Sequence, residues 1–265
     1  MKLYHKYSYF IFDLDGTIYR GYKIIERAAE TINHLTEIGK KIIFVSNKTT
    51  DTAHDYFIFL RKSGFEIQEN QILTSTIVLK NYLSENFKKK NFFAIGEKKF
   101  LDEMSQINLS YSEDESDIQI VIITLDRTFN YEKLEIAARA IENGAKFFAA
   151  NIDDTCPVES GEVLDAGSII SALEKRTKRR LELHFGKPSE FMIGEIRKRL
   201  NFENDKTLII GDRLETDIAM GKIMSVDTAL VSTGVRNSLN GNHNLHPTYQ
   251  LNSIADLIDK ESISE

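Results

Sequence analysis

The sequence contains few cysteines and few prolines. It has one cysteine, Cys156, and three prolines, at positions 157, 188 and 247, among 265 residues. A single cysteine cannot form an internal disulfide or a cysteine-rich metal site, which fits a reducing compartment, so we expect a cytoplasmic protein. The prolines form no linker, and there is no internal repeat or low-complexity tract. Any domain boundary therefore has to be located by other means.

Long apolar runs and an excess of positive charge are also missing. The first apolar run, residues 9–12, is closed by Asp13 and is too short for a signal-peptide core or a membrane span. Acidic side chains outnumber basic ones by 40 to 34, for a formal net charge of −6. This balance removes the bulk attraction behind nonspecific nucleic-acid binding and argues against an anionic membrane surface. We therefore expect a small-molecule partner, and neither nucleic acid nor membrane.

Composition and length set the scale of the fold. Hydrophobic residues make up 42% of the chain and charged residues 28%, as in ordinary soluble globular proteins. For a chain of 30.3 kDa, folding buries about 73% of the unfolded surface, enough for one large core or two modest ones. Length alone permits one domain or two.

Short apolar runs alternate with helical patterns. The runs rich in β-branched or aromatic residues, which predict strands buried on both faces, are residues 8–12, 41–45, 118–125 and 207–210. In residues 26–38 the apolar side chains recur at spacings of four and three before Gly39, which predicts a helix, and a second helix is expected over about residues 51–62. Strands alternating with helices predict an α/β fold with a Rossmann-like, doubly wound parallel sheet.

Polar residues follow the predicted strands. Sheets of this kind bind ligands at the carboxyl ends of their strands. Three such ends carry residues 13–17 (DLDGT), 46–48 (SNK) and 211–217 (GDRLETD). A fourth segment, residues 186–188 (GKP), precedes a predicted helix whose first position we assign to Pro188.

The acidic residues at these ends predict a metal site. Asp13 and Asp15 are two apart, so their carboxylates leave an extended chain on the same side, where they repel unless a cation or a shared proton intervenes. Asp212 follows another strand, with Asp217 about one helical turn further on. Oxygen ligands with no histidine or cysteine nearby suit Mg²⁺.

The remaining strand-end residues suit a phosphate group. Ser46 offers a hydroxyl, and Lys187 offers a positive charge. Carboxylate, metal, hydroxyl and lysine together indicate phosphoryl transfer through an aspartyl phosphate. Asp13 would attack in line, and Asp15 would protonate the leaving oxygen and later deprotonate the hydrolytic water.

These residues resemble the four ordered motifs of the haloacid dehalogenase-like (HAD) phosphatases. The finer pattern, in residues 19–21, 45–47 and 211–218, is similar to the type IIA subfamily, which is NagD-like or 4-nitrophenylphosphatase-like. The resemblance spans about residues 9–235. It implies that Asp13 is nucleophile and metal ligand, and that Asp15 is the general acid and base and binds Mg²⁺ through its main-chain carbonyl.

The resemblance also implies the roles of the other motif residues. Asp212 would be the third protein ligand of Mg²⁺, and Asp217 would orient a water on the metal. Ser46 and Asn47 would hold the phosphoryl group. Lys187 would neutralise the nucleophile and the phosphate. Many relatives have a second asparagine where this chain has Lys48, which we retain as a phosphate- or substrate-binding candidate.

Motif spacing locates an inserted domain. Residues 16–45 are already used by the segment near Tyr19 and by the first helix, whereas the 140 residues from 47 to 186 are comparable to a whole domain. This is the position of the α/β type C2 cap of type II relatives. We expect a HAD-like core from residues 1–77 and 184–265 and a cap from residues 78–183.

One segment of the insert resembles the subfamily's substrate-specificity loop. Residues 149–157 match the cap loop that overhangs the active site and selects the leaving group, which makes Asp153, Asp154 and Cys156 substrate-binding candidates. A homodimer through the cap is expected from the resemblance. The physiological substrate does not follow from this loop.

Other interpretations remain open. An isolated Asp-x-Asp can simply end a strand in a turn, and Asp217 can be a favourable charge in the first turn of a helix. The function expected is a Mg²⁺-dependent phosphatase acting on a small phosphorylated metabolite: a polyol, glycolate or sugar phosphate, or a nucleotide. The alternatives are a phosphomutase and a catalytically silent phosphometabolite-binding protein, although Asp13, Asp15 and Lys187 are all present.

Overall fold

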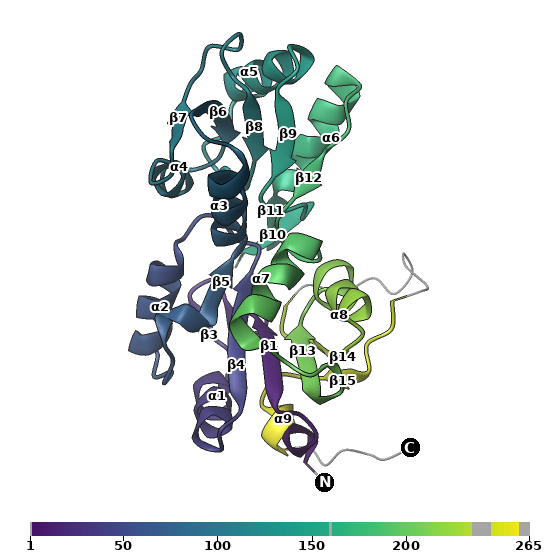
Figure 1. Cartoon of the computed structure of the whole chain (residues 1–265). Coiled ribbons are helices and arrows are strands. Elements are labelled where there is room, and N and C mark those ends of the chain that lie inside the picture. Colours follow the sequence, from purple (N-terminus) through teal and green to yellow (C-terminus); the bar gives the residue numbers. More distant parts are fainter. Residues whose placement is uncertain (1, 159–160, 235–244, 260–265) are drawn as a thin grey trace.

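The computed structural model describes residues 2–158, 161–234 and 245–259. Two parallel sheets follow one another along the length of the molecule (Figure 1). The strands of the six-stranded sheet, in spatial order, are β15 (Tyr249–Leu251), β14 (Asp227–Val231), β13 (Thr207–Gly211), β1 (Tyr9–Asp13), β4 (Lys41–Ser46) and β5 (Ile72–Thr74). Those of the five-stranded sheet are β12 (Leu183–His184), β9 (Lys146–Ala149), β8 (Ile120–Ile123), β6 (Lys90–Ile95) and β7 (Leu109–Tyr111).

Helices cover both faces of each sheet. The α-helices are α1 (Ala28–Glu37), α2 (Ala53–Lys62), α3 (Ser75–Asn86), α4 (Lys98–Met104), α5 (Tyr131–Glu142), α6 (Ala166–Thr177), α7 (Glu190–Leu200), α8 (Ala219–Met224) and α9 (Asp256–Asp259). Shorter turns of 3-10 helix lie at Leu3–His5, Glu69–Gln71 and Asn204–Lys206, and a π-helical turn lies at Leu214–Ile218. Two antiparallel hairpins complete the structure: β2 (Tyr19–Arg20) with β3 (Lys23–Ile24), and β10 (Thr155–Val158) with β11 (Gly161–Leu164).

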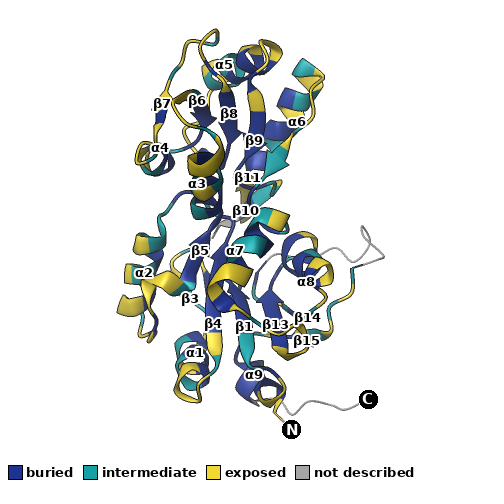
Figure 2. Cartoon of the chain, viewed as in Figure 1, coloured by how far each residue is buried: buried dark blue, intermediate teal, exposed yellow. Residues whose placement is uncertain are grey.

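The central strand β1 shows why the chain forms a doubly wound sheet. Phe10 and Phe12 point to one face, where they pack with α1, α2 and α9, and Ile11 points to the opposite face, towards α7 and α8. All three side chains are fully buried, as an apolar run in a parallel sheet requires. Figure 2 shows the same burial along the central strands of both sheets. The predicted α/β fold is confirmed.

One apolar core joins the two sheets. It contains Ile11 and Val45 of the six-stranded sheet, Phe92 and Ile122 of the five-stranded sheet, and the inner faces of α3 and α7 between them. The outer face of the five-stranded sheet packs separately against α5 and α6. Because α3 and α7 pack on both sheets, the carboxyl ends of the six-stranded sheet are held facing the second sheet.

The chain leaves the six-stranded sheet after β5 and returns to it after β12. We keep the division into residues 1–77 with 184–265 and residues 78–183 as a proposal. Val235, at the C-terminal limit of the resemblance, lies outside the described residues. Within the described residues, the structure contains no helix of the length and apolarity needed to cross a bilayer.

The predicted strands and helices are found, and each end lies no more than two residues from its predicted position. The assignment of Pro188 to the first position of a helix is wrong. Helix α7 begins at Glu190, and Ser189 is its N-cap, with a hydroxyl that accepts a hydrogen bond from the backbone N–H of Met192. Serine satisfies a free N–H at a helix start, which proline cannot do. Pro188 therefore precedes the cap.

Candidate active site

The predicted site residues meet where β1, β4 and β13 end. Asp13 is the last residue of β1 and pairs in register with Val45 of β4, next to Ser46. On the other side, Phe12 pairs with Ile210, which places the end of β13 and Asp212 beside Asp13. The three parallel strands therefore bring their polar ends to one crevice, as the strand-end argument predicts.

Three buried carboxylates cluster in this crevice. Asp13, Asp212 and Asp217 each offer one oxygen, and these oxygens lie within 4.8 Å of one another. Burial raises the pKa of Asp13 well above its usual value; Lys187 opposes this shift, while the charges of Asp217 and Asp212 reinforce it. Without a further cation, the cluster is therefore electrostatically unfavourable.

Lys187 partly compensates this charge. Its side chain is 3% exposed, and its ammonium group donates to Oδ1 of Asp13 and, at 2.7 Å, to Oδ1 of Asp217. Burial alone would lower the pKa of Lys187, but the two carboxylates outweigh burial and raise it. Lys187 is therefore a charged lysine held between two acids, and it remains charged at neutral pH.

Two carboxylate oxygens have no donor. Among the described residues, Oδ2 of Asp13 and Oδ1 of Asp15 are buried and have no hydrogen-bond partner. A buried anionic oxygen without a donor is costly. A cation between Asp13 and Asp212 would remove that cost for Oδ2 of Asp13.

Two glycines allow Asp212 to reach the crevice. Gly16 has φ of +91°, and a Cβ at Gly16 would overlap the carboxylate of Asp212. A Cβ at Gly234 would overlap the same carboxylate. The glycine of the DLDGT motif is thus needed both for its backbone conformation and for the close approach of Asp212.

The loop after β4 surrounds the crevice with polar groups. Ser46 is buried, and its Oγ accepts a hydrogen bond of 3.2 Å from the backbone N–H of Lys48. The Lys48 ammonium donates to Oδ2 of Asp15 at 2.7 Å. Burial opposes the charge of Lys48, but the nearby Asp15 carboxylate raises its pKa overall.

Asn47 lines the crevice with Asp13 and Ser46, and its side-chain amide also binds protein groups. Its Oδ1 accepts a hydrogen bond from the backbone N–H of Lys187, and its Nδ2 donates to Oδ2 of Asp153 at 2.8 Å and to the carbonyl of Lys187 at 3.3 Å. The amide of Asn47 is therefore engaged in holding the lysine loop and the loop before β10.

That loop supplies one side of a small cavity of about 40 Å³. Asp153 and Cys156 line it with the core residues, whereas Asp154 is exposed and outside the lining. Burial raises the pKa of the Cys156 thiol to about 12. The structure therefore brings two of the three predicted loop residues to the site.

Asp165 also lines this cavity and is a residue that sequence reasoning missed. It is the N-cap of α6, and its Oδ1 accepts hydrogen bonds from Asn151 Nδ2 at 3.0 Å and from the Ala166 N–H at 2.6 Å. Burial, reinforced by the charge of Asp153, raises the pKa of Asp165 to about 6. Asp165 follows the exposed strand β11 and precedes a helix, as an ordinary N-cap residue does. Its local sequence therefore does not indicate a site residue.

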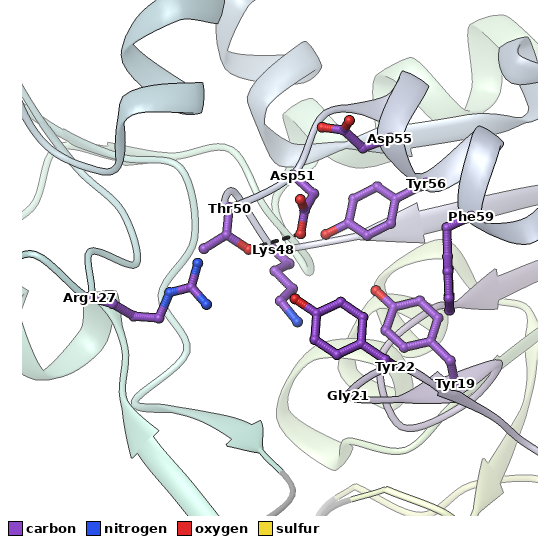
Figure 3. Close-up of a pocket in the computed structure, with 10 residues that line it drawn as sticks. All are labelled: Tyr19, Gly21, Tyr22, Lys48, Thr50, Asp51, Asp55, Tyr56, Phe59 and Arg127. Carbon is purple, nitrogen blue, oxygen red and sulfur yellow. Dashed lines mark hydrogen bonds between the residues drawn. The ribbon is translucent and has the colours of Figure 1, made fainter.

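A larger cavity of about 330 Å³ adjoins the first (Figure 3). Its lining residues are Tyr19, Gly21, Tyr22, Lys48, Thr50, Asp51, Asp55, Tyr56, Phe59 and Arg127. Sequence reasoning missed Tyr22 and Arg127 as site residues. Arg127 follows the predicted strand at residues 118–125, so the strand-end argument, applied to the inserted segment, could have found it.

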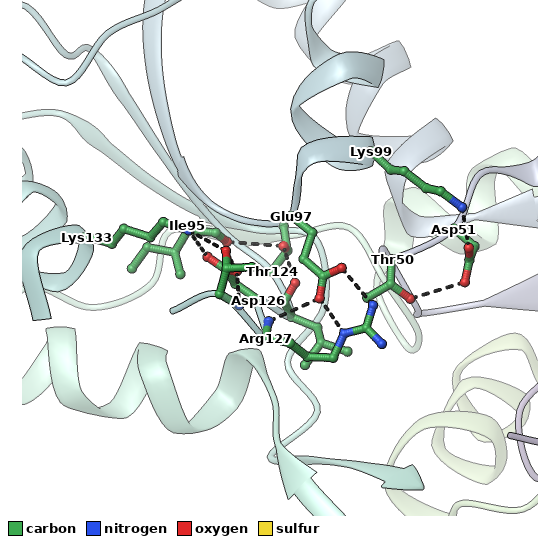
Figure 4. Close-up of polar contacts among 11 residues, drawn as sticks. Thr50, Asp51, Ile95, Glu97, Lys99, Thr124, Asp126, Arg127 and Lys133 are labelled. Carbon is green, nitrogen blue, oxygen red and sulfur yellow. Dashed lines mark hydrogen bonds and ion pairs between the residues drawn. The ribbon is translucent and has the colours of Figure 1, made fainter. Parts of the chain in front are cut away.

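Beside this cavity, one set of ion pairs joins the inserted segment to the loop and helix after β4, and another lies within the inserted segment (Figure 4). Lys99 at the start of α4 donates to Asp51 at 2.7 Å and to Asp55 at 3.0 Å, near the start of α2. Arg127 is paired with Glu97 through Nε at 2.6 Å and Nη2 at 2.8 Å.

Comparison with known proteins agrees with this geometry. A sequence model of the haloacid dehalogenase-like hydrolases matches residues 10–110, and a HAD-hydrolase-like model matches residues 184–257. The chain is 33% identical over 248 residues to the sugar-phosphatase AraL of Bacillus subtilis, covering 93% of this chain and 90% of that protein.

Solved structures give the same result. The p-nitrophenyl phosphatase of Archaeoglobus fulgidus is 31% identical with a TM-score of 0.86, covering 96% of this chain and 99% of that one. A glycerol phosphate phosphatase of Mycobacterium tuberculosis, solved in complex with magnesium, is 26% identical with a TM-score of 0.84, covering 97% and 78%. These matches agree with the buried acidic crevice at the strand ends. The chain belongs to the haloacid dehalogenase-like hydrolases and is a phosphoric monoester hydrolase of the NagD-like, type IIA kind.

Proposed function

We propose that this protein is a Mg²⁺-dependent phosphatase that hydrolyses a small phosphorylated metabolite through an aspartyl phosphate on Asp13. The substrate classes considered are polyol, glycolate and sugar phosphates, and nucleotides. One observation carries the proposal: Lys187 holds one oxygen of Asp13, and the other is buried beside Asp212 and Asp217 without a donor from any described residue.

The residues present fit a magnesium ion. The candidate ligands are all oxygens, from the carboxylates of Asp13 and Asp212 and the main-chain carbonyl of Asp15, as Mg²⁺ prefers. Oδ2 of Asp13 is buried and accepts no hydrogen bond from the part of the chain that the structure describes, which supports a cation there. When bound, the ion would supply positive charge that offsets the repulsion between the acidic crevice and a phosphate dianion.

The reaction would proceed in two displacements. An oxygen of Asp13 attacks phosphorus as the bond from phosphorus to the ester oxygen breaks, and protonated Asp15 gives its proton to that leaving oxygen. Asp15 then takes a proton from water, whose oxygen attacks the phosphorus of the aspartyl phosphate. The bond to Asp13 breaks, and inorganic phosphate leaves.

Neighbouring groups would position the phosphoryl oxygens. Ser46, Lys48 and Lys187 line the small cavity with Asp13 and Asp15. Asn47 would act by positioning Lys187 and Asp153 through its amide. Asp217 would hold the ammonium of Lys187 in place. Cys156 and Asp153 are kept as cavity-lining candidates, while exposed Asp154 is not.

Release of nitrophenol and phosphate from p-nitrophenyl phosphate tests the proposal. We expect turnover that is lost with EDTA, restored by Mg²⁺, and reduced at least a thousandfold by Asp13→Asn. Asp102→Asn, at an exposed ion pair on α4, is the matched control and should keep wild-type activity. Retained activity in the Asp13→Asn variant would contradict the proposal, and phosphorus recovered in an isomeric ester would indicate a mutase. A homodimer through the cap and a cytoplasmic location stay predictions.

A further inference from the structure

The two aspartates of the proposed mechanism have the same kind of environment. Lys187 donates to Oδ1 of Asp13, and Oδ2 of Asp13 is buried without a donor from any described residue. Lys48 donates to Oδ2 of Asp15 at 2.7 Å, and Oδ1 of Asp15 is buried and accepts no hydrogen bond from the described residues either. Each carboxylate therefore has one oxygen bound by a lysine and one that no described residue binds.

Lys48 is itself held in place. Its backbone N–H donates to Oγ of Ser46 at 3.2 Å, at the end of β4. Its ammonium lies 6.0 Å from the centre of the Tyr19 ring, at the outer limit of a cation–π contact (Figure 3). The Lys48 side chain is 21% exposed and that of Asp15 is 12% exposed, so salt screens this ion pair less than a pair on the surface. The ammonium therefore occupies a defined position beside the crevice.

The turn that carries Asp15 is fixed from the other side. The backbone N–H of Gly16 donates to the carbonyl of Tyr19 at 2.6 Å, and the N–H of Tyr19 donates to the carbonyl of Leu14 at 3.2 Å. Leu14 and Tyr19 are both buried in the core, which anchors this turn. The backbone of Asp15 is therefore held by the turn, and the orientation of its carboxylate is set by Lys48.

We propose that Lys48 is a positioning residue for Asp15. It binds Oδ2 of the carboxyl group, so that Oδ1 is the oxygen that carries the proton to the leaving group. The inference rests on the proposed phosphatase function and deepens it, because it gives Lys48 a role that is exerted through Asp15 instead of by direct contact with phosphate.

The hydrogen bond from Lys48 also bears on the energy of the proton transfer. As an oxygen of Asp13 bonds to phosphorus and the bond from phosphorus to the ester oxygen breaks, the proton on Oδ1 of Asp15 moves to that ester oxygen. Negative charge develops on the carboxyl group during this step, and the ammonium on Oδ2 stabilises it. An interaction that strengthens in the transition state raises the rate.

The other role open to Lys48 is direct binding of the phosphoryl group, since Lys48 lines the small cavity. The two roles differ in what they predict. The phosphoryl group is the same in every substrate, so direct binding would matter equally for all leaving groups. Proton donation matters most where the leaving oxygen is most basic. The dependence of the rate on the leaving group therefore separates them.

A series of aryl phosphates of similar size tests the proposal. In order of rising basicity of the leaving phenolate, the substrates are p-nitrophenyl, p-chlorophenyl, phenyl and p-methylphenyl phosphate. They are compared in Mg²⁺ by kcat/KM, which reflects transfer to Asp13 and not the later hydrolysis of the aspartyl phosphate. Lys48→Met should lower kcat/KM for p-methylphenyl phosphate about tenfold to a hundredfold, and that for p-nitrophenyl phosphate by about threefold at most.

Two further variants complete the test. Lys48→Gln keeps a hydrogen-bond donor without the charge, so its kcat/KM values should depend on the leaving group more than in the wild type and less than in Lys48→Met. Lys80→Met is the matched control. Lys80 lies on α3 outside the lining of both cavities, its side chain is also 21% exposed, and it pairs with Glu103 at 2.9 Å. This control should keep wild-type kcat/KM for all four esters.

Three results would overturn the proposal and leave the phosphatase function standing. An equal fall for all four esters in Lys48→Met and Lys48→Gln would assign Lys48 to direct phosphoryl binding. Wild-type kcat/KM in both variants would show that the ion pair with Asp15 has no part in catalysis. The same selective loss in Lys80→Met would make it a general effect of charge. If the wild type releases phosphate from none of the esters, the phosphatase function itself fails, and this inference fails with it.

Discussion

The backbone N–H of Lys187 donates a hydrogen bond of 2.6 Å to the side-chain oxygen of Asn47, 140 positions earlier in the chain. The same asparagine donates to Asp153 through its nitrogen. One amide thus holds the loop of the buried lysine and the loop that covers the crevice. The position of Lys187 between Asp13 and Asp217 depends on this contact as well as on its ion pairs.

Asn47→Ala should therefore reduce catalysis without preventing folding. Losing the acceptor frees the Lys187 loop, and a misplacement of about 1 Å at a reacting centre can cost about a hundredfold in rate. We expect kcat for p-nitrophenyl phosphate to fall by about that factor. Far-ultraviolet circular dichroism should stay unchanged, and stability should fall by about 1–3 kcal/mol because buried groups lose a partner.

Asn47→Asp keeps the acceptor for Lys187 and places a second carboxylate against Asp153. It should retain more activity than Asn47→Ala if positioning of Lys187 is what matters. Equal loss in both variants would indicate that the contact to Asp153, or direct contact with substrate, dominates.

Gly16→Ala should abolish activity through the displacement of Asp212. The new methyl group would overlap the Asp212 carboxylate, and φ of +91° would strain the backbone. We expect a loss of at least a hundredfold in kcat/KM and no increase in melting temperature on addition of Mg²⁺. Gly39→Ala is the matched control, since Gly39 has φ of +78° and open space around its Cβ position. It should share the strain, about 1 kcal/mol, and keep full activity. Full activity in the Gly16→Ala variant would refute the close approach.

Asp165 should make stability depend on pH. Its folded pKa is raised from 3.8 to about 6, so the folded state binds this proton more tightly than the unfolded state. The contribution to stability is complete below about pH 4 and is lost as the pH rises through about 6, a change of about 3 kcal/mol. Asp165→Asn keeps an N-cap oxygen for the Ala166 N–H and removes the titration. Urea unfolding in EDTA at pH 4 to 7 gives the free energy of unfolding of both proteins. The variant should gain stability relative to wild type as the pH rises. If the two free energies change in parallel with pH, the raised pKa of Asp165 is disproved.

The ion pairs of Lys99 should help to hold the inserted segment against the start of α2. Lys99→Met removes the contacts to Asp51 and Asp55, which are partly exposed and screened by salt. We expect the KM of the Lys99→Met variant for p-nitrophenyl phosphate to differ from that of the wild type by about threefold at low ionic strength. This difference should vanish near 1 M NaCl. Lys98→Met is the control, because Lys98 pairs with Asp102 within the same helix. The same shift in both variants would show that only net charge matters.

Most of the core of the site could be predicted from local sequence. The apolar runs of β1 and β4 end at the polar residues Asp13 and Ser46, Asp212 directly follows β13, and parallel strands have their carboxyl ends at one edge. The type and order of these residues are enough to bring carboxylates, a hydroxyl and a lysine together. Pro188 was misassigned because proline at a first helical position and proline before a serine cap look alike until the cap hydrogen bond is seen.

The sequence by itself determined the fold class and the residues at the carboxyl ends of the central strands, because apolar runs, helical spacing and the residues that follow each run are local properties. Only the tertiary structure decided how the inserted segment meets them. It engages the Asn47 amide with Lys187 and Asp153, leaves Asp154 exposed, and sets Arg127 across the cavity from Tyr22. These contacts depend on the packing of α3 and α7 against both sheets, which joins residues far apart in the chain and leaves no periodic trace in the sequence.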